Sequence, residues 1–342
     1  MLATALIFVS FSHIFLVVGA APGPLDFGPL HDIASNLLDK AGGIISAESN
    51  DALDDIFEAS GSKATTIVSP SDLTTAFSRP AYFSRAAYCS AAAVMAFSCG
   101  APCDALVDSV KILVTGGLGG LIPRFIIAHD NSTNSIVVAH QGTDPSSIIS
   151  IANDVELLLT PIDTEVFPSA AQKNVLVHSG FLDTFLRTAP IVLSAVKHGI
   201  SATGATSVVL TGHSLGATLA TLDGLMLNDA LTNVSIRTIT FGSPRIGNQA
   251  FADFVDASFS NGSYLRMTNK ADPVPHVPPV FYVHAQGEVH LGEGGAMACE
   301  GQENDSAGCA DGVGLLAIAT GINDHTGPYF DDISFGQDQC LI

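Results

Sequence analysis

Basic residues are scarce in this sequence, and the shortage excludes several classes of partner. The chain of 342 residues holds 13 lysines and arginines against 33 aspartates and glutamates, which gives a formal net charge of −20. No run of lysine or arginine interrupts this excess of acidic side chains. Phosphate backbones and anionic membrane surfaces repel such a chain, so we expect it not to bind nucleic acid.

Two further features are missing. None of the six cysteines forms a C-x-x-C pair, so we expect no zinc site, and no motif calls for another metal or a cofactor. After the first stretch of the chain, no segment is long and apolar enough to cross a bilayer, which predicts no stable membrane insertion. Hydrophobic residues nevertheless make up 47% of the chain, enough to bury a sizeable core.

The N-terminus has the pattern of a secretory signal peptide. Residues 2–18 are nearly all apolar and lead to the small residues Val18-Gly19-Ala20, although no lysine or arginine precedes them. We expect residues 1–20 to be removed and the protein to be secreted and extracellular, with an uncleaved anchor as the alternative. The even number of cysteines fits disulfide bonds in that compartment, and four sequons predict N-glycosylation at Asn131, Asn233, Asn261 and Asn304.

The rest of the chain divides at about residue 67. Residues 21–67 carry no chemical motif and are interpreted as an N-terminal extension or pro-segment; residues 68–342 are expected to form a single catalytic domain and a monomer. Apolar, β-branched runs there alternate with helical spacing, which is typical of a mostly parallel sheet covered by helices on both faces. The strands are expected at 135–139, 207–210, 236–241 and 264–267, and the helices at 181–198 and 215–231.

A G-x-S-x-G motif lies between one of these strands and one of these helices. The segment Gly212-His213-Ser214-Leu215-Gly216 follows the strand at 207–210 and opens the helix at 215–231. This setting is typical of a nucleophile elbow, in which a tight turn holds the serine hydroxyl outward and leaves no room for a Cβ at either glycine. Ser214 is therefore the predicted nucleophile.

The sequence resembles the fungal extracellular class 3 lipases, a family that includes feruloyl esterases. The resemblance covers residues 68–342 and rests on the elbow together with Val137-Val-Ala-His-Gln-Gly-Thr-Asp144, Val177-His-Ser-Gly-Phe181, Phe241-Gly-Ser-Pro-Arg-Ile-Gly-Asn248, Asn269-Lys-Ala-Asp-Pro-Val-Pro275 and Asp324-His-Thr-Gly-Pro-Tyr-Phe330. It implies an α/β-hydrolase fold with a helical lid. One segment departs from the pattern, because many members carry Phe-Arg-Gly-Ser where this chain has His140-Gln141-Gly142-Thr143.

The order Ser, then acid, then His is typical of this fold and selects the other catalytic residues. His325 lies late in the chain, in a loop rich in glycine and asparagine, and matches the family's last motif. Asp272 follows the strand at 264–267, and Pro273 restricts the chain leaving it. Asp324 is the rival acid, but it would have to fold back sharply to reach the neighbouring ring.

The oxyanion hole requires two N–H donors. The elbow supplies the N–H of Leu215, and the resemblance assigns the second donor to Thr143. The segment after Thr143 begins with Asp144 and Pro145, a favourable helix start. Its apolar stripe and its position predict an amphipathic lid, with a core helix as the alternative; the lid residues are Ile148, Ile149, Ile151 and Val155.

Six cysteines permit many pairings. Short spacing favours Cys99–Cys103 and Cys299–Cys309, which leaves Cys89–Cys340, and the resemblance implies a similar link between the two ends of the domain.

Together these features predict a secreted serine ester hydrolase. They favour a triacylglycerol lipase or carboxylesterase that acts on its ester substrate at a lipid–water interface. A feruloyl-type esterase uses the same chemistry in a different pocket and is the alternative. A catalytically silent lipid-binding relative would require a broken triad, and a serine peptidase is disfavoured by the resemblance.

Overall fold

The computed structural model describes residues 7–10, 13–16, 63–143, 158–260 and 262–341. The chain divides into two compact units, Met1–Gly61 and Ser62–Ile342. In the first unit, β1 (Ile7–Ser10) and β2 (His13–Leu16) pair as antiparallel strands within the predicted signal peptide. The predicted N-terminal extension lies almost entirely outside the described residues.

The second unit is built on a nine-stranded sheet. Its spatial order is β3 (Thr65–Val68), β13 (Gly295–Cys299), β12 (Glu288–Gly292), β11 (Tyr264–Asn269), β10 (Ser235–Phe241), β9 (Ser207–His213), β6 (Ser135–His140), β5 (Phe125–Asp130) and β4 (Val110–Gly116). The five central strands, from β12 to β6, run parallel, and antiparallel strands extend the sheet on both sides. β9 therefore lies next to β10, the middle strand of the sheet, and β3 begins slightly before the predicted domain boundary at residue 68.

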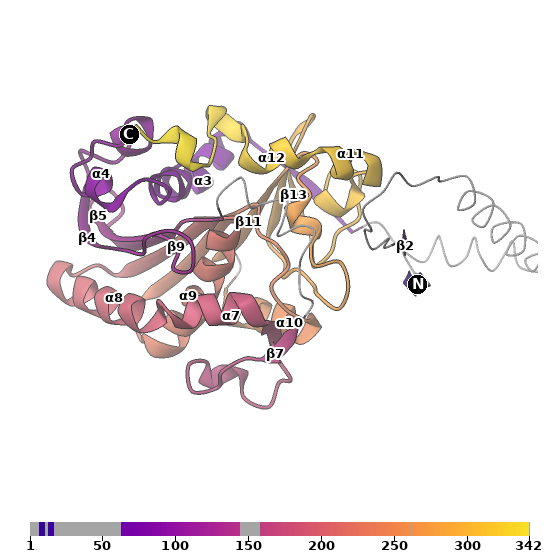
Figure 1. Cartoon of the computed structure of the whole chain (residues 1–342), viewed down its shortest axis with the longest axis horizontal. Coiled ribbons are helices and arrows are strands. Elements are labelled where there is room, and N and C mark those ends of the chain that lie inside the picture. Colours follow the sequence, from indigo (N-terminus) through magenta and orange to yellow (C-terminus); the bar gives the residue numbers. More distant parts are fainter. Residues whose placement is uncertain (1–6, 11–12, 17–62, 144–157, 261, 342) are drawn as a thin grey trace, which may run out of the picture. The chain divides into compact units, whose positions relative to one another are not determined.

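Helices cover both faces of this sheet (Figure 1). The described helices are α3 (Pro70–Ala86), α4 (Ala91–Met95), α5 (Ala101–Asp104), α7 (Ser179–Leu186), α8 (Ala189–Thr203), α9 (Leu215–Ala230), α10 (Gln249–Ser258), α11 (Leu315–Thr320) and α12 (Ile322–Thr326). A small hairpin joins β7 (Leu159–Pro161) to β8 (Leu176–His178). Short 3₁₀ turns occur at Pro168–Ala170, Val274–His276, Ala310–Gly312, Phe330–Asp332 and Gln337–Gln339.

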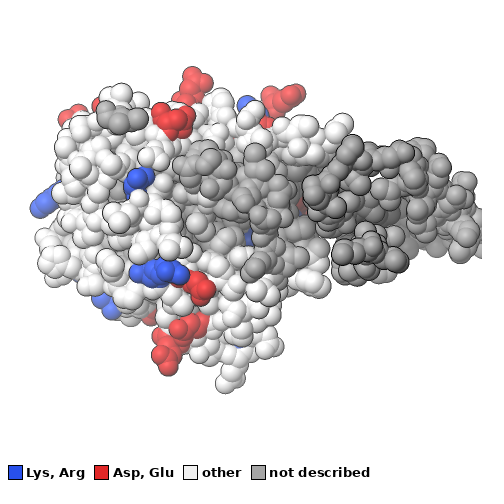
Figure 2. Space-filling view, in the orientation of Figure 1, with Lys and Arg blue, Asp and Glu red and all other residues white. Residues whose placement is uncertain are grey.

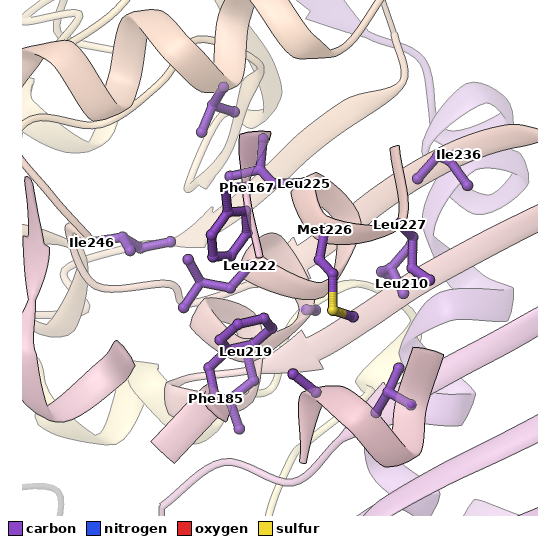
Figure 3. Close-up of a cluster of buried hydrophobic side chains, with 14 of the residues drawn as sticks. Phe167, Phe185, Leu210, Leu219, Leu222, Leu225, Met226, Leu227, Ile236 and Ile246 are labelled. Atoms are coloured by element: carbon purple, nitrogen blue, oxygen red, sulfur yellow. The ribbon is translucent and has the colours of Figure 1, made fainter. Parts of the chain in front are cut away.

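The helix α9 is buried between the central strands and the helices α7, α8 and α10. This helix packs across β6, β9 and β10, while α7, α8 and α10 cover its outer side. Every residue from Gly216 to Leu227 is buried. Figure 3 shows Leu219, Leu222 and Leu225 of α9 among the aromatic rings of the same cluster. Each fully buried leucine contributes roughly 1.5–3 kcal/mol, so α9 and the elbow at its start are firmly anchored.

The opposite face is covered by α3 and by the C-terminal segment. Phe77 of α3 packs with Phe241 of β10 and with Phe330. A further cluster around Phe83 and Leu106 covers β5 and β6. This face therefore brings the beginning and the end of the domain together over the central strands.

The helix predicted at 181–198 is wrong as a single element. The structure divides it into α7, which ends at Leu186, and α8, which begins at Ala189. Pro190 occupies the first turn of α8, and a proline has no N–H to continue a helix from the preceding turn. The apolar spacing continues across the break because both helices pack against the same core.

Three disulfides join the six cysteines as Cys89–Cys340, Cys99–Cys103 and Cys299–Cys309. These are the pairs that short spacing and the family resemblance favoured. Cys89 follows α3 and Cys340 lies close to the C-terminus, so their bond links the two segments that cover one face of the sheet.

Replacing Cys89 and Cys340 together by alanine should lower the free energy of unfolding by up to about 5 kcal/mol. The bond closes a loop of 251 residues, and opening it restores much conformational entropy to the unfolded chain. Replacing Cys99 and Cys103, which are separated by 4 residues, is the control and should cost about 2 kcal/mol by the same relation. Urea unfolding without reductant measures both, and a larger loss for the short loop would contradict the prediction.

Candidate active site

Ser214 lies in a strained turn between β9 and α9. Its φ of 59° and ψ of −128° place a non-glycine residue in a region that L-residues rarely occupy. The turn is held because the Ser214 N–H donates to the Phe241 carbonyl at 3.0 Å. A Cβ at Gly212 would collide with the Gly216 carbonyl, and one at Gly216 would collide with the His140 carbonyl. Both glycines of the motif are therefore required by close packing.

Asp272 and His325 come together although they are distant in sequence. His325 Nδ1 lies 2.9 Å from Asp272 Oδ2 and 3.0 Å from Oδ1, and both side chains are buried. A carboxylate accepts, so Nδ1 carries a hydrogen, and in the neutral form of the ring Nε2 then has a lone pair. Nε2 is buried and has no hydrogen-bond partner among the described residues. The pair thus has the arrangement of a base oriented by an acid.

The turn that bears Asp272 is held by its neighbours. Val274 N–H donates to Asp272 Oδ1 at 2.9 Å, which fixes the carboxylate. Asp324, the rival acid, accepts from the Ala271 N–H at 3.2 Å through Oδ2, while its carbonyl accepts from Asn269 Nδ2 at 2.8 Å. Asp324 therefore ties the His325 helix to the Asp272 turn.

Because Gly242 has no side chain, it leaves space for the side chains of Asp272 and His325 to meet. A Cβ there would lie 2.9 Å from the Tyr329 hydroxyl, 3.1 Å from Asp272 Oδ2 and 3.1 Å from His325 Cε1. The φ of +52° at Gly242 also disfavours any other residue.

His213 is a part of the site that the sequence reasoning did not single out. Its Nε2 lies 2.7 Å from the His325 carbonyl, and its Nδ1 lies 2.7 Å from the Tyr88 hydroxyl. Burial, followed by the nearby His325 ring, holds the pKa of His213 well below its ordinary value. The ring is therefore neutral: Nε2–H donates to the carbonyl, and Tyr88 donates to Nδ1. No signal in the sequence distinguished this histidine, since it occupies a variable position of the G-x-S-x-G pattern.

The His325 backbone receives a second donor from Tyr329, whose hydroxyl lies 3.2 Å from the same carbonyl. Burial, together with the Asp272 charge, raises the pKa of Tyr329 well above its ordinary value. The phenol consequently stays protonated and keeps this bond.

The end of β6 approaches Ser214 closely. A Cβ at Gly142 would lie 3.0 Å from Ser214 Cβ and would collide with the Tyr88 hydroxyl. Thr143 follows directly, and its Oγ1 is buried without a hydrogen-bond partner among the described residues. Leu215 is the first residue of α9, so its N–H has no acceptor within the helix. The two predicted donors therefore flank Ser214.

Several predicted residues remain untested. Ile148, Ile149, Ile151 and Val155 of the predicted lid, and the sequon residue Asn261, lie outside the described residues. Asn131 and Asn233 are exposed and stay predictions as glycosylation sites.

Asn304 is different, because its side chain is fully buried and its Nδ2 donates to the Ala64 and Glu300 carbonyls at 3.2 and 3.0 Å. The structure argues against a glycan there, because the amide nitrogen that would carry the sugar is enclosed and already bonded.

The described part of the chain contains no group of three or more His, Cys, Asp or Glu side chains placed to hold a metal ion. None of its helices has the length and apolar character needed to span a membrane.

The parallel central strands, the elbow after β9 and the acid–base pair beyond it define a hydrolase of the α/β-hydrolase fold. The solved structure of the Lip2 lipase from Yarrowia lipolytica shares this fold, with a TM-score of 0.69 and 23% identity, covering 82% of this chain and 99% of that one. The native lipase–propeptide complex of Rhizomucor miehei matches with a TM-score of 0.65, 24% identity, and coverage of 80% and 84%.

The sequence comparisons identify the family. The model of the family Lipase (class 3) matches residues 137–282. The secreted mono- and diacylglycerol lipase LIP2 of Malassezia restricta is 30% identical over 230 residues, which cover 66% of this chain and 70% of that protein. The related MDL5 of Malassezia globosa is 31% identical over 233 residues, with coverage of 66% and 72%. The chain belongs to the class 3 lipase family and is a carboxylic ester hydrolase.

Proposed function

We propose that this chain is a secreted lipase that hydrolyses acylglycerol esters through Ser214, Asp272 and His325. The observations that support the proposal are the buried His325–Asp272 pair, whose Nε2 has no hydrogen-bond partner among the described residues, and the strained backbone of Ser214. Acyl transfer needs a nucleophile, a base with a lone pair and an acid that orients the base, and these three residues supply those groups.

In the first half of the reaction, Ser214 Oγ attacks the ester carbonyl carbon while its proton passes to His325 Nε2. The ring becomes an imidazolium, which the Asp272 carboxylate stabilises. Negative charge develops on the former carbonyl oxygen, and the N–H groups of Thr143 and Leu215 donate to it. Hydrogen bonds from such donors are stronger in a buried site than in water, and removing one donor typically lowers kcat by about 10²–10³.

In the second half, the intermediate expels the alcohol, which takes the proton from His325 Nε2. The acyl group remains on Ser214 Oγ. A water molecule then attacks this ester while giving a proton to Nε2, and that proton returns to Ser214 as the fatty acid leaves. Asp272 stays ionised throughout.

The names of the relatives and the charge of the chain support a neutral lipid as substrate. The Malassezia relatives are named mono- and diacylglycerol lipases, and both names include the word secreted. On the face drawn in Figure 2, the described charged side chains are scattered between large uncharged areas. A net charge of −20 opposes docking on an anionic surface but not on a neutral one.

The experiment that tests this proposal is a panel of soluble and emulsified esters, with the purified chain. We expect hydrolysis of p-nitrophenyl esters and of mono- and diolein, and a much smaller kcat/KM for methyl ferulate. Both enzyme types use the same acyl-transfer steps and differ in the pocket that binds the acyl group. The preference for the aromatic ester over fatty-acid esters therefore distinguishes them. A kcat/KM for methyl ferulate above that of every fatty-acid ester would identify a feruloyl-type esterase instead.

A further inference from the structure

A buried histidine–aspartate pair lies beside the elbow, and the reaction described above makes no use of it. His140 Nε2 lies 2.5 Å from Asp223 Oδ2, and neither side chain has any exposed surface. His140 is the last residue of β6, and Asp223 lies in the middle of α9. At 2.5 Å a proton must lie between the two atoms, because two lone pairs at that distance repel each other.

The surroundings make this pair a poor source of stability. The ring of Phe125 is 6.0 Å from that of His140, and Leu219 and Leu222 of α9 belong to the same apolar core. The second polar atom of each partner, His140 Nδ1 and Asp223 Oδ1, is buried with no hydrogen bond to any described residue. Burial raises the pKa of Asp223, against the opposing effect of His140. An apolar pair of similar volume would fill the same space at no loss of stability.

The pair joins the two elements that carry the proposed oxyanion donors. His140 pairs in register with Gly212 of β9, and its carbonyl lies against Gly216 at the start of α9. Thr143 follows three positions later on the chain that leaves β6, and Leu215 opens the helix that bears Asp223. The separation of the two N–H donors therefore depends on how β6 is held against α9.

The direct contact between β6 and α9 at the elbow is made by backbone atoms around glycine. Van der Waals contact of this kind resists compression but gives little resistance to separation or sliding. A short hydrogen bond to a carboxyl group is directional and resists both. The His140–Asp223 bond supplies such a restraint further along the same helix.

We propose that His140 and Asp223 are positioning residues, which hold the end of β6 against α9 and so keep the Thr143 and Leu215 donors at the spacing that the oxyanion requires. This inference rests on the proposed function. Neither side chain touches the substrate, and their effect is on the transition state more than on binding. A small displacement of such donors reduces the rate strongly, because they must meet the oxygen only as its charge develops.

The test is the double variant His140→Phe with Asp223→Ala, which replaces the pair by apolar groups. We expect its Tm to equal or exceed that of the unmodified chain, and its kcat on p-nitrophenyl butyrate to fall about 10–100-fold with little change in KM. The rate at which a fluorophosphonate labels Ser214 should fall in parallel, because the phosphoryl oxygen occupies the same oxyanion hole. Asp223→Asn, which keeps the shape of the side chain, is the second variant if the double variant does not fold, and its kcat should also fall.

A buried ion pair elsewhere provides the matched control. Arg266 Nη2 lies 2.9 Å from Glu288 Oε2, both side chains are almost fully buried, and the pair joins β11 to β12 away from the elbow. Glu288→Gln should lower the Tm and leave kcat and the labelling rate unchanged. The contrast separates loss of an ion pair from loss of donor geometry.

Two results would overturn the inference: a double variant with the kcat and labelling rate of the unmodified chain, or a loss of kcat in Asp223→Asn no greater than in Glu288→Gln at equal Tm. An unmodified chain that neither hydrolyses esters nor labels at Ser214 would contradict the proposed function instead, so the two failures are distinguishable.

Discussion

Ser214→Ala should abolish ester hydrolysis while the protein stays folded. The change removes the atom that we propose attacks the carbonyl. A triad enzyme without its nucleophile retains only the rate that binding and the oxyanion hole supply, a loss on the order of 10⁶ in kcat. Hydrolysis of p-nitrophenyl butyrate by the purified variant measures the loss of activity, and its thermal unfolding shows whether the protein stays folded.

The folded state should tolerate this substitution well. Ser214 is held by its backbone N–H bond to Phe241 and by the packing of Gly212 and Gly216, none of which involves the hydroxyl. Alanine keeps the strained φ that serine already has. We therefore expect a Tm close to that of the unmodified chain.

A fluorophosphonate probe provides the control. It should label the unmodified chain at Ser214, and Ser214→Ala should not react. Ser84 is a matched buried serine, with its Oγ bonded to Thr211 Oγ1 at 2.8 Å below the central strand, and Ser84→Ala should label normally. Residual esterase activity near the original level in Ser214→Ala would show that another residue is the nucleophile.

Asp272→Asn should lower kcat by about 10³–10⁴ without unfolding the protein. In the present geometry His325 Nδ1–H donates to the carboxylate, so the lone pair is on Nε2. An asparagine amide in that place favours the other tautomer, in which Nε2 carries the hydrogen and cannot accept the proton of Ser214. The variant also cannot stabilise the imidazolium that forms during attack. Steady-state kinetics with a soluble ester should show the loss in kcat, with KM affected much less.

Asp324→Asn is the comparison that separates the two candidate acids. Asp324 accepts from the Ala271 N–H and does not bond the His325 ring. An asparagine oxygen can still accept from that N–H, so we expect a far smaller loss of kcat than in Asp272→Asn. If Asp324→Asn were the more damaging change, the acid would have been assigned wrongly.

Local sequence patterns predicted the structure correctly where neighbouring residues in the chain determine it. The elbow is one example, because the glycines on both sides of Ser214, the strand before it and the helix after it lie within one continuous segment. The disulfides Cys99–Cys103 and Cys299–Cys309 are another, since close spacing leaves each cysteine a nearby partner. Apolar runs likewise predicted the central strands β6, β9, β10 and β11.

Patterns failed in two places, for different reasons. The apolar spacing of residues 181–198 describes one buried face and cannot reveal that Pro190 opens a second helix. The Asn304 sequon is a correct local pattern, but the fold encloses its amide. Pro190 is a local signal that apolar spacing alone does not detect, whereas the burial of Asn304 exists only in the folded chain.

By itself, the sequence determined the nucleophile candidate, the class of chemistry and the family, because motifs act through bonded neighbours and a tight turn is a local property. Only the tertiary structure decided how the rest of the site is supported. His213 meets Tyr88 and the His325 carbonyl, and His140 meets Asp223, across separations of 125, 112 and 83 residues. Hydrogen bonds depend on distance and angle in space, so such contacts exist only once the sheet and its helices have packed.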